Sequence, residues 1–225
     1  MSIIRIAIDG PSGAGKSTLA RAVAGELGCL YVDTGAIYRT VGCYVRAQGL
    51  DPKDEAAVTA ALPGVSIEIT HGEDGLQHML LNGEDVTDAI RLPEISRYAS
   101  DVSAHPGVRA FLLEMQRKLA RERSVIMDGR DIGTVVLSDA EVKIFLTASP
   151  EARARRRCLE LEQRGTPQPY ETVLREIQER DWSDTHRDIA PLRQAEDAVV
   201  LDTTELDFQA SEAALLRLIR ERTQA

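Results

Sequence analysis

The sequence contains few aromatic residues, few lysines and few cysteines, and it has no long apolar run. Aromatic residues make up 4% of the 225 residues, the net charge is −9 at pH 7 and the pI is about 5.0. A general nucleic-acid binder needs a basic face and aromatic stacking platforms, so the composition argues against that class. No stretch approaches the roughly 18 apolar residues of a membrane-spanning helix. We expect neither nucleic acid nor a membrane as a partner.

The three cysteines, Cys29, Cys43 and Cys158, are odd in number and far apart. This spacing does not fit a disulfide framework or a zinc knuckle. The amino-terminal segment also lacks a secretory pattern, since Arg5 interrupts a short strand-like run and Asp9 follows it. With 43% hydrophobic and 28% charged residues, the chain can bury a core. These features predict a soluble, reduced, cytoplasmic α/β protein.

Lysine is scarce because arginine supplies most of the positive charge. Of the 27 cationic residues, only Lys16, Lys53, Lys118 and Lys143 are lysines. A GC-rich genome favours arginine codons and would produce this excess without functional meaning. The position of each arginine, and not the number, must therefore identify those that carry chemistry.

Hydrophobic periodicity predicts strands that alternate with helices, which is typical of a parallel sheet covered on both faces. Between residues 65 and 87 two turn signals, at 72–75 and 82–83, separate short β-type runs. They predict a small antiparallel sheet inserted into the βα rhythm. We expect strands at 3–8, 30–32, 125–127, 142–146 and 198–201, and helices at 16–27, 35–48, 51–63, 91–103, 106–123, 150–164, 170–187 and from 208 to the C-terminus.

Residues 10–18 read G-P-S-G-A-G-K-S-T, which fits the phosphate-loop pattern G-x-x-x-x-G-K-[ST] between a predicted strand and helix. Glycines let backbone N–H groups point at phosphates, and the following helix presents its positive dipole end. Lys16 can reach the outer phosphates and the Ser17 hydroxyl can ligate Mg²⁺. We expect ATP to contact Gly10, Pro11, Ser12, Gly13, Ala14, Gly15, Lys16, Ser17 and Thr18.

A dinucleotide-binding loop is the nearest alternative to this interpretation. Gly13 and Gly15 match its first two glycines, but Thr18 stands where the third glycine belongs. Asp33 imitates the acidic residue that binds ribose in that motif. The Lys16-Ser17 pair is foreign to a dinucleotide loop, so the phosphate loop fits better.

Two more polar motifs follow predicted strands. Residues 33–39 read D-T-G-A-I-Y-R and residues 128–134 read D-G-R-D-I-G-T. Ligands bind at the carboxyl ends of the strands in an open parallel sheet, so both motifs are candidate parts of one site. Either motif taken alone is also consistent with a capped helix or a solvated loop. Asp128 is a candidate to position Mg²⁺ through water, and a structural cap is the alternative.

Together with E-R-D-x-x-D-x-x-R at 179–187, these motifs resemble the bacterial cytidylate (CMP/dCMP) kinases. The resemblance spans nearly the whole chain, including the small-sheet insert. It implies the P-loop nucleoside monophosphate kinase fold, an α/β fold with a five-stranded parallel sheet flanked by helices, a small antiparallel β insert and a helical lid. It also implies phosphoryl transfer from Mg·ATP to CMP or dCMP, giving ADP and CDP or dCDP in pyrimidine metabolism, by a cytoplasmic monomer.

The resemblance further implies one kinase chain with three kinds of subregion. The core would comprise residues 1–33, 124–149 and 194–225. The region that binds the nucleoside monophosphate would span 34–123, and residues 150–193 would form the lid and the following helix. Five positions at 153–157 include four arginines, of which Arg156 is expected to contact ATP; a solvated helix face is the alternative.

Individual roles also follow from the resemblance. Thr34, Tyr38 and Arg39 would contact the monophosphate substrate, and Asp184 would contact its sugar. Ser100, Arg109 and Asp131 would read the pyrimidine edge. The catalytic set would be Lys16, Arg130, Arg180 and Arg187, whose three arginines would also bind CMP. The role of Trp182 stays open.

The chemistry of phosphoryl transfer is consistent with these residue types. The reaction needs alignment and neutralisation of charge, and the planar guanidinium fork of arginine binds phosphate in a bidentate manner. A carboxylate such as that of Asp131 can accept a hydrogen bond from the exocyclic amine of cytosine. Kinases for another small acceptor, such as UMP, shikimate or dephospho-CoA, are the closest alternatives, and the small-sheet insert and the tract at 179–187 argue against them. A GTP-dependent switch is disfavoured because its base-reading N-K-x-D is absent.

Overall fold

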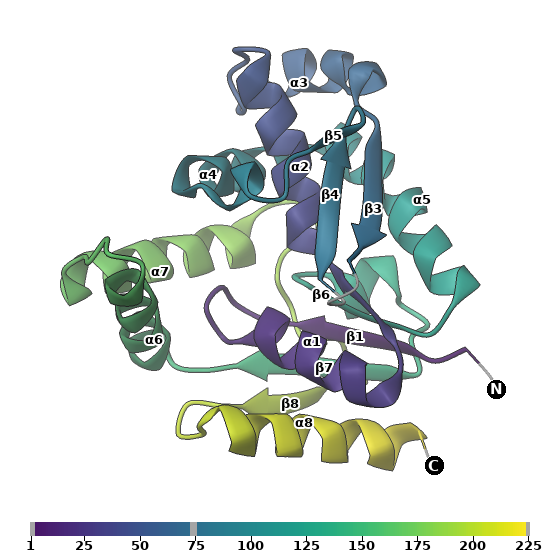
Figure 1. The fold of residues 1–225 in the computed structure, drawn as a ribbon, viewed down its shortest axis with the longest axis vertical. Coiled ribbons are helices and arrows are strands. Elements are labelled where there is room, and N and C mark those ends of the chain that lie inside the picture. The colour runs from purple at the N-terminus through teal and green to yellow at the C-terminus, as the bar shows by residue number, and fades with distance from the viewer. Residues whose placement is uncertain (1–2, 73–75, 224–225) are drawn as a thin grey trace. The chain divides into compact units, whose positions relative to one another are not determined.

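The computed structural model describes residues 3–72 and 76–223 and divides the chain into two compact units. Unit 1 combines residues 1–30 with residues 123–225. Unit 2 consists of residues 31–122. Figure 1 shows the elements of both units along the chain.

The main sheet has five strands in the order β2-β6-β1-β7-β8, as predicted. The central strand β1 pairs in parallel with β6 and β7, and β7 pairs in parallel with β8. Ile6 and Ile8 of β1 are completely buried. The chain therefore leaves β1 between two neighbouring strand ends. The strands are β1 (Arg5–Asp9), β2 (Leu30–Asp33), β6 (Val125–Gly129), β7 (Val142–Thr147) and β8 (Val199–Asp202).

Two pairs of helices accompany the strands of unit 1. The helix α1 (Lys16–Leu27) packs against α8 (Phe208–Thr223) and against β1 and β6. The helices α6 (Pro150–Gln163) and α7 (Tyr170–His186) pack together around a small apolar core that includes Leu161 and Val173. The predicted break between these two helices is confirmed (Figure 1).

Unit 2 combines helices with the predicted small sheet. Its antiparallel strands are β3 (Ile67–His71), β4 (Gln77–Leu81) and β5 (Glu84–Asp85), in that order. The predicted turn at 72–75 lies largely outside the described residues. Close packing of two helices depends on Gly42, since a Cβ there would lie 3.0 Å from the backbone nitrogen of Ala99. The helices are α2 (Thr34–Ala47), α3 (Glu55–Ala61), α4 (Pro93–Val102) and α5 (Pro106–Glu122), with single turns η1 (Leu62–Gly64) and η2 (Ala89–Arg91).

The structure corrects two predicted helix boundaries. The helix predicted at 51–63 begins only at Glu55, because the Asp54 side chain caps it by accepting a hydrogen bond from the backbone N–H of Ala57. The helix predicted at 91–103 begins only at Pro93, as α4, because the separate turn η2 ends at Arg91. Leu92 adopts an extended conformation and Pro93 starts the new helix, a position that suits proline.

A third difference follows β6, where the sequence suggests only a loop. Residues Ile132–Val136 form a short π-helical turn, η3. Its first two N–H groups, those of Ile132 and Gly133, donate to the carboxylate of Asp9 at 2.7 Å each. A distant side chain therefore caps this turn.

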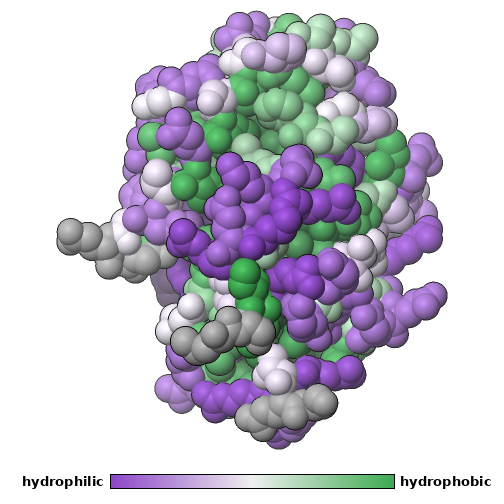
Figure 2. Space-filling model, turned by 90° about the vertical axis from the view of Figure 1, so that its right-hand side faces the viewer, coloured by the Kyte–Doolittle hydropathy of each residue, from purple (hydrophilic) through white to green (hydrophobic). Residues whose placement is uncertain are grey.

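Hydrophilic residues (purple) alternate with smaller groups of hydrophobic residues (green) on the face of the molecule shown in Figure 2. Large apolar side chains with high exposure include Leu159 on α6 and Trp182 on α7, which are 59% and 66% exposed. Trp182 stacks on His186 one turn further along α7, with ring centroids 4.7 Å apart. Within residues 3–72 and 76–223, none of the helices combines the length and the apolar character needed to cross a membrane.

Candidate active site

The predicted phosphate loop leaves β1 and turns sharply into α1. Gly10 has φ of +151°, and a Cβ at this position would lie 1.9 Å from the carbonyl oxygen of Leu146 in β7. Only glycine tolerates this close approach to a neighbouring strand. Gly15 lies just before α1 in a left-handed conformation, with φ of +90°. The loop is therefore shaped by its glycines, as the sequence predicts.

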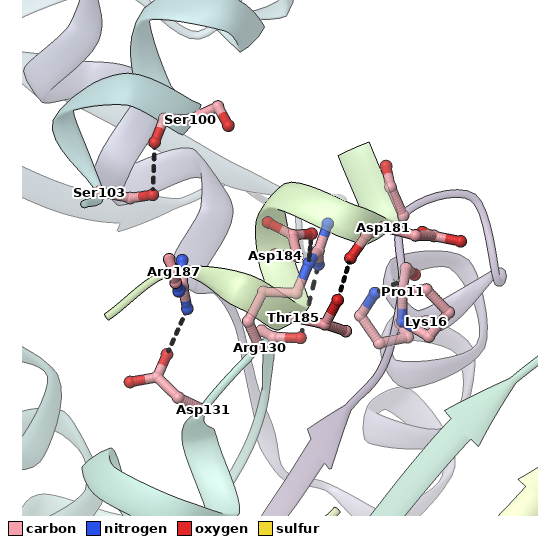
Figure 3. Close-up of polar contacts among 12 residues, drawn as sticks. Pro11, Lys16, Ser100, Ser103, Arg130, Asp131, Asp181, Asp184, Thr185 and Arg187 are labelled. Atoms are coloured by element: carbon pink, nitrogen blue, oxygen red, sulfur yellow. Dashed lines mark hydrogen bonds and ion pairs between the residues drawn. The ribbon is translucent and has the colours of Figure 1, made fainter. Parts of the chain in front are cut away.

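Lys16, the first residue of α1, is 5% exposed, and its Nζ donates to the carbonyl oxygen of Pro11 at 2.8 Å (Figure 3). Burial lowers the pKa of Lys16, and the positive charge of Arg130 lowers it further. The carboxylates of Asp128, Asp184 and Asp9 oppose this shift. The ammonium group thus binds the carbonyl oxygen of Pro11 inside the loop. Because a buried positive charge is unfavourable, an anion bound next to it would stabilise the charged form.

Ser17 lies next to a carboxylate from another strand. Its hydroxyl donates to Oδ2 of Asp128 at 2.9 Å, and Asp128 is 4% exposed at the end of β6. A hydroxyl and a carboxylate are oxygen ligands of the kind that Mg²⁺ prefers. Among the described residues, His, Cys, Asp and Glu form no cluster of three or more that could hold a metal by themselves. The predicted metal residue Ser17 therefore lies beside a carboxylate, that of Asp128, that could share a metal with it.

Asp9 is a buried carboxylate that none of the sequence motifs assigns to the site. It ends β1 directly before the phosphate loop and caps η3 through Ile132 and Gly133. Burial raises the pKa of Asp9 to about 6, although both N–H donors act in the opposite direction. Its position at a strand end, directly before Gly10, is the signal that could have identified it.

This raised pKa predicts a specific dependence of stability on pH. The stabilisation from protonated Asp9 is complete below the ordinary pKa of 3.8 and is lost as the pH rises through about 6. The Asp9→Asn variant has no titrating carboxyl group here and therefore lacks this pH-dependent stabilisation. The unfolding free energy of the native protein minus that of the variant should therefore fall by about 2–3 kcal/mol between pH 4 and pH 7. Urea titrations at both pH values measure it, and an unchanged difference would contradict the prediction.

Two charge pairs bring the motif after β6 together with α7 and the residue after it (Figure 3). Arg130 Nε donates to Asp184 Oδ2 at 2.6 Å, and Arg187 Nη2 lies 3.9 Å from Asp131 Oδ1. The structure thus gathers these predicted residues within unit 1. Burial alone would raise the pKa of Asp184, but Arg130, Arg180 and Arg187 outweigh burial and hold this pKa below its ordinary value. Three guanidinium groups thus act on one buried carboxylate, and guanidinium groups are suited to binding a phosphate.

Arg156, the arginine predicted to contact ATP, lies on α6 and bonds to the loop after β8. Its guanidinium donates to the hydroxyl and the carbonyl oxygen of Thr203 and to the carbonyl oxygen of Leu206. The deeply buried arginine of α6 is Arg153, to which the sequence motifs give no individual role. It contacts the carbonyl oxygen of Ser12 in the phosphate loop at 3.0 Å.

In unit 2 the D-T-G-A-I-Y-R motif spans the end of β2 and the first turns of α2. Asp33 caps the helix by accepting from the N–H of Ala36, and it also pairs with Arg39 at 2.7 Å. The Nε of Arg39 is buried and has no hydrogen-bond partner among the described residues. Thr34 is 3% exposed and lies one turn before Tyr38 on α2. An unused guanidinium donor near a hydroxyl and a phenol suits an anionic ligand.

The other predicted residues of unit 2 adjoin α2 through α4 and α5. The guanidinium carbon of Arg109 lies 5.6 Å from the centre of the Tyr38 ring. Arg109 Nη1 also donates to the carbonyl oxygen of Ser103, whose hydroxyl donates to the carbonyl oxygen of Ser100. Unit 2 therefore connects Tyr38, Arg109 and Ser100 through consecutive contacts.

Comparison of the sequence with known protein families shows which family has these motifs. The family model described as "Cytidylate kinase" matches residues 6–221. The chain belongs to the cytidylate kinase family. Membership makes it a nucleoside monophosphate kinase, a phosphotransferase, and the family predicted from the sequence motifs is confirmed.

Two curated relatives illustrate how fully the family covers this chain. The cytidylate kinase of Caldicellulosiruptor bescii is 52% identical over 93% of this chain and 92% of its own length. The cytidylate kinase of Carboxydothermus hydrogenoformans is 51% identical over 96% of this chain and 97% of its own length. Among solved structures, an uncharacterised protein from Eubacterium ventriosum covers all of both chains with a TM-score of 0.52 at 13% identity, which shows a similar fold alone.

Proposed function

We propose that this protein transfers the γ-phosphoryl group of ATP to CMP or dCMP, giving ADP and CDP or dCDP. The observation that carries the proposal is the arginine cluster of unit 1, in which the charges of Arg130, Arg180 and Arg187 act on the buried Asp184, whose carboxylate in turn acts on Lys16. The cytidylate kinase relatives support CMP and dCMP as acceptors. Other small acceptors, against which the insert and the tract at 179–187 already argue, are thereby further disfavoured.

In the proposed reaction the protein binds, aligns and neutralises two nucleotides. The phosphate loop, residues 10–18, holds the ATP phosphates with its N–H groups and Lys16. Arg130, Arg180 and Arg187 neutralise the transferring phosphoryl group and bind the acceptor phosphate.

Asp184 holds Arg130 in place and contacts the acceptor sugar. Thr34, Tyr38 and Arg39 contact the acceptor, and Ser100, Arg109 and Asp131 read the cytosine edge. Arg156, joined to the loop after β8, contacts ATP.

Mg²⁺ is the metal that we propose for this kinase. Ser17 and Asp128 would hold it, Ser17 directly and Asp128 through water, in keeping with the few protein ligands that magnesium uses at nucleotide phosphates. When bound, it neutralises charge on the phosphate oxygens. Removal of divalent metal with a chelator is expected to stop turnover and leave the fold intact.

We also propose that the protein acts as a cytoplasmic monomer without nucleic-acid or membrane partners. The net charge of −9 and the pI of about 5.0 support the absence of a nucleic-acid partner. The subregions at 1–33, 124–149 and 194–225 form the proposed core. Residues 34–123 bind the acceptor and residues 150–193 form the lid and the following helix.

The test of the function is ADP formation with Mg·ATP across CMP, dCMP, UMP, AMP and shikimate at equal concentrations. The cytidine nucleotides are expected to be the fastest acceptors. No turnover with either of them, or faster turnover with AMP, would overturn the proposal. The panel also separates this enzyme from kinases for shikimate and other small acceptors.

Asp131→Ala tests how the base is recognised. Asp131 is 4% exposed and close to Arg187, and a carboxylate accepts from the exocyclic amine of cytosine. The ratio of kcat/KM for CMP to that for UMP should fall by about 5- to 150-fold, since such a contact is worth about 1–3 kcal/mol. The KM for ATP should change little. The exposed Asp139→Ala is the control, and equal losses with every acceptor would show that Asp131 does not read the base.

A further inference from the structure

Arg153, in the first turn of α6, connects three segments of unit 1. It is 2% exposed, and its Nε donates to the carbonyl oxygen of Ala148 at 2.8 Å. Its Nη1 donates to the carbonyl oxygen of Ser12, in the phosphate loop, at 3.0 Å. Both terminal nitrogens also bind the carboxylate of Asp181 on α7, at 2.9 and 2.5 Å. All three guanidinium nitrogens are therefore used.

The acidic partner is placed on the helix that carries the proposed phosphate-binding groups. Asp181 directly follows Arg180 and precedes Asp184 by about one turn of α7. Figure 3 shows Asp181 and Asp184 on this helix, with Asp184 bonded to Arg130. The helix is therefore joined to the phosphate loop through Asp181 and to the end of β6 through Asp184.

An ordinary surface ion pair would not support a functional role, because exposed pairs contribute little. This pair differs because the Arg153 side chain is 3% exposed and the carboxylate binds it through two parallel hydrogen bonds. Asp181 is the more exposed member of the pair, with 24% of its side chain accessible, and both residues line a cavity of about 380 Å³ together with Pro11. One guanidinium group therefore binds both the Ser12 carbonyl oxygen of the phosphate loop and the Asp181 carboxylate of α7.

We propose that Asp181, acting through Arg153, is a positioning residue that couples the phosphate loop to α7. ATP phosphates bound in the loop fix the position of the Ser12 peptide. Arg153, which binds the Ser12 carbonyl oxygen, then fixes the position of Asp181. The neighbouring Arg180 is thereby held where it can bind the acceptor phosphate. The inference rests on the proposed function for the role of Arg180. It gives Asp181, a motif residue without an assigned task, a role that involves no contact with substrate.

The test is the thermodynamic coupling between the two nucleotides. CMP affinity of the native protein is measured by calorimetry with and without a non-hydrolysable ATP analogue and Mg²⁺. Coupling between sites is reciprocal and typically 5- to 150-fold. We expect the analogue to tighten CMP binding at least fivefold in the native protein and less than twofold in Asp181→Asn, which keeps the size of the side chain but loses its charge. The kcat should fall about 10- to 100-fold, with a less than threefold change in the KM for ATP.

Several controls separate positioning from a loss of folding. Glu160→Gln removes an exposed carboxylate on α6 that pairs with Arg157, and it should leave both kcat and the coupling unchanged. Asp181→Glu keeps the charge and should restore part of the coupling. Arg153→Lys, which loses the fork, should lose coupling to the same extent as Asp181→Asn, and the double variant should lose no more.

The outcomes distinguish this inference from the proposed function. Absence of turnover with CMP in the native protein would overturn the proposed function. An active native enzyme whose coupling survives in Asp181→Asn would overturn the positioning role alone. So would an equal, parallel rise in the KM values of both nucleotides without a change in kcat.

Discussion

Lys16→Met is expected to remove most of the phosphoryl transfer and yet to stabilise the protein without nucleotide. Lys16 is 5% exposed, and burial lowers its pKa because the ammonium group has left water. When ATP binds, the same charge faces the outer phosphates, where a preorganised donor is worth about 10²–10³ in kcat. Without ATP the buried charge lowers the stability of the folded protein. Replacing it with an apolar chain of similar length should raise the unfolding free energy by about 1 kcal/mol.

The sign of the pH dependence distinguishes this explanation from a general packing effect. A group whose pKa is lowered in the folded state contributes stability above its ordinary pKa, 10.5 for lysine, and loses it as the pH falls. The gain in Lys16→Met should therefore be full near neutral pH and shrink towards pH 10.5. Denaturant titrations at several pH values measure it. The exposed Lys118→Met is the control, and a destabilised Lys16→Met would contradict the argument.

Arg130 variants are expected to lose the most activity. Arg130 is the arginine that connects the end of β6 to Asp184, through a 2.6 Å hydrogen bond, and its charge also acts on Lys16. A transition-state arginine is worth about 10³–10⁵ in the rate of related phosphoryl transfers. Arg130→Met should therefore reduce kcat by about 10³-fold or more, measured as ADP formation with saturating ATP and CMP.

Arg130→Met also removes the nearest partner of a carboxylate that is 8% exposed, and breaking a buried pair costs about 3–5 kcal/mol. Arg130→Lys keeps a charge for Asp184 but loses the bidentate fork, so it tests catalysis in a more stable protein. It should remain folded and still lose at least tenfold in kcat. Arg220→Met on α8, which is 58% exposed and pairs with Glu26, is the matched control. An Arg130→Lys variant with native kcat would show that charge alone suffices.

The fold could be predicted from local signals wherever these signals are contiguous. The five strands and the inserted sheet follow from hydrophobic periodicity and turn residues, and all of them appear in the structure. The boundaries of the helix predicted at 51–63 were wrong because Asp54, a single capping side chain, overrides the apolar spacing. The π-helical turn after β6 could not be foreseen, since its cap is Asp9, 123 residues away from Ile132.

Some residues of the candidate site could be predicted from local motifs, and others could not. The motifs identified Lys16, Arg130 and Asp184, because each stands in a short pattern with a recognisable chemistry. They did not identify Asp9 or Arg153, whose importance depends on what they contact. Arg153 is one of several arginines in a locally neutral stretch, and only burial and the carboxylate of Asp181 set it apart.

The sequence by itself determines the phosphate loop and the family, since the loop chemistry needs only adjacent residues and the family motifs occur in a recognisable order. Only the tertiary structure decides which charges neutralise one another. Arg130 and Asp184 are 54 positions apart, and Arg153 and Asp181 are 28 apart. An ion pair depends on distance and burial in space, and neither quantity is encoded at a single position in the chain.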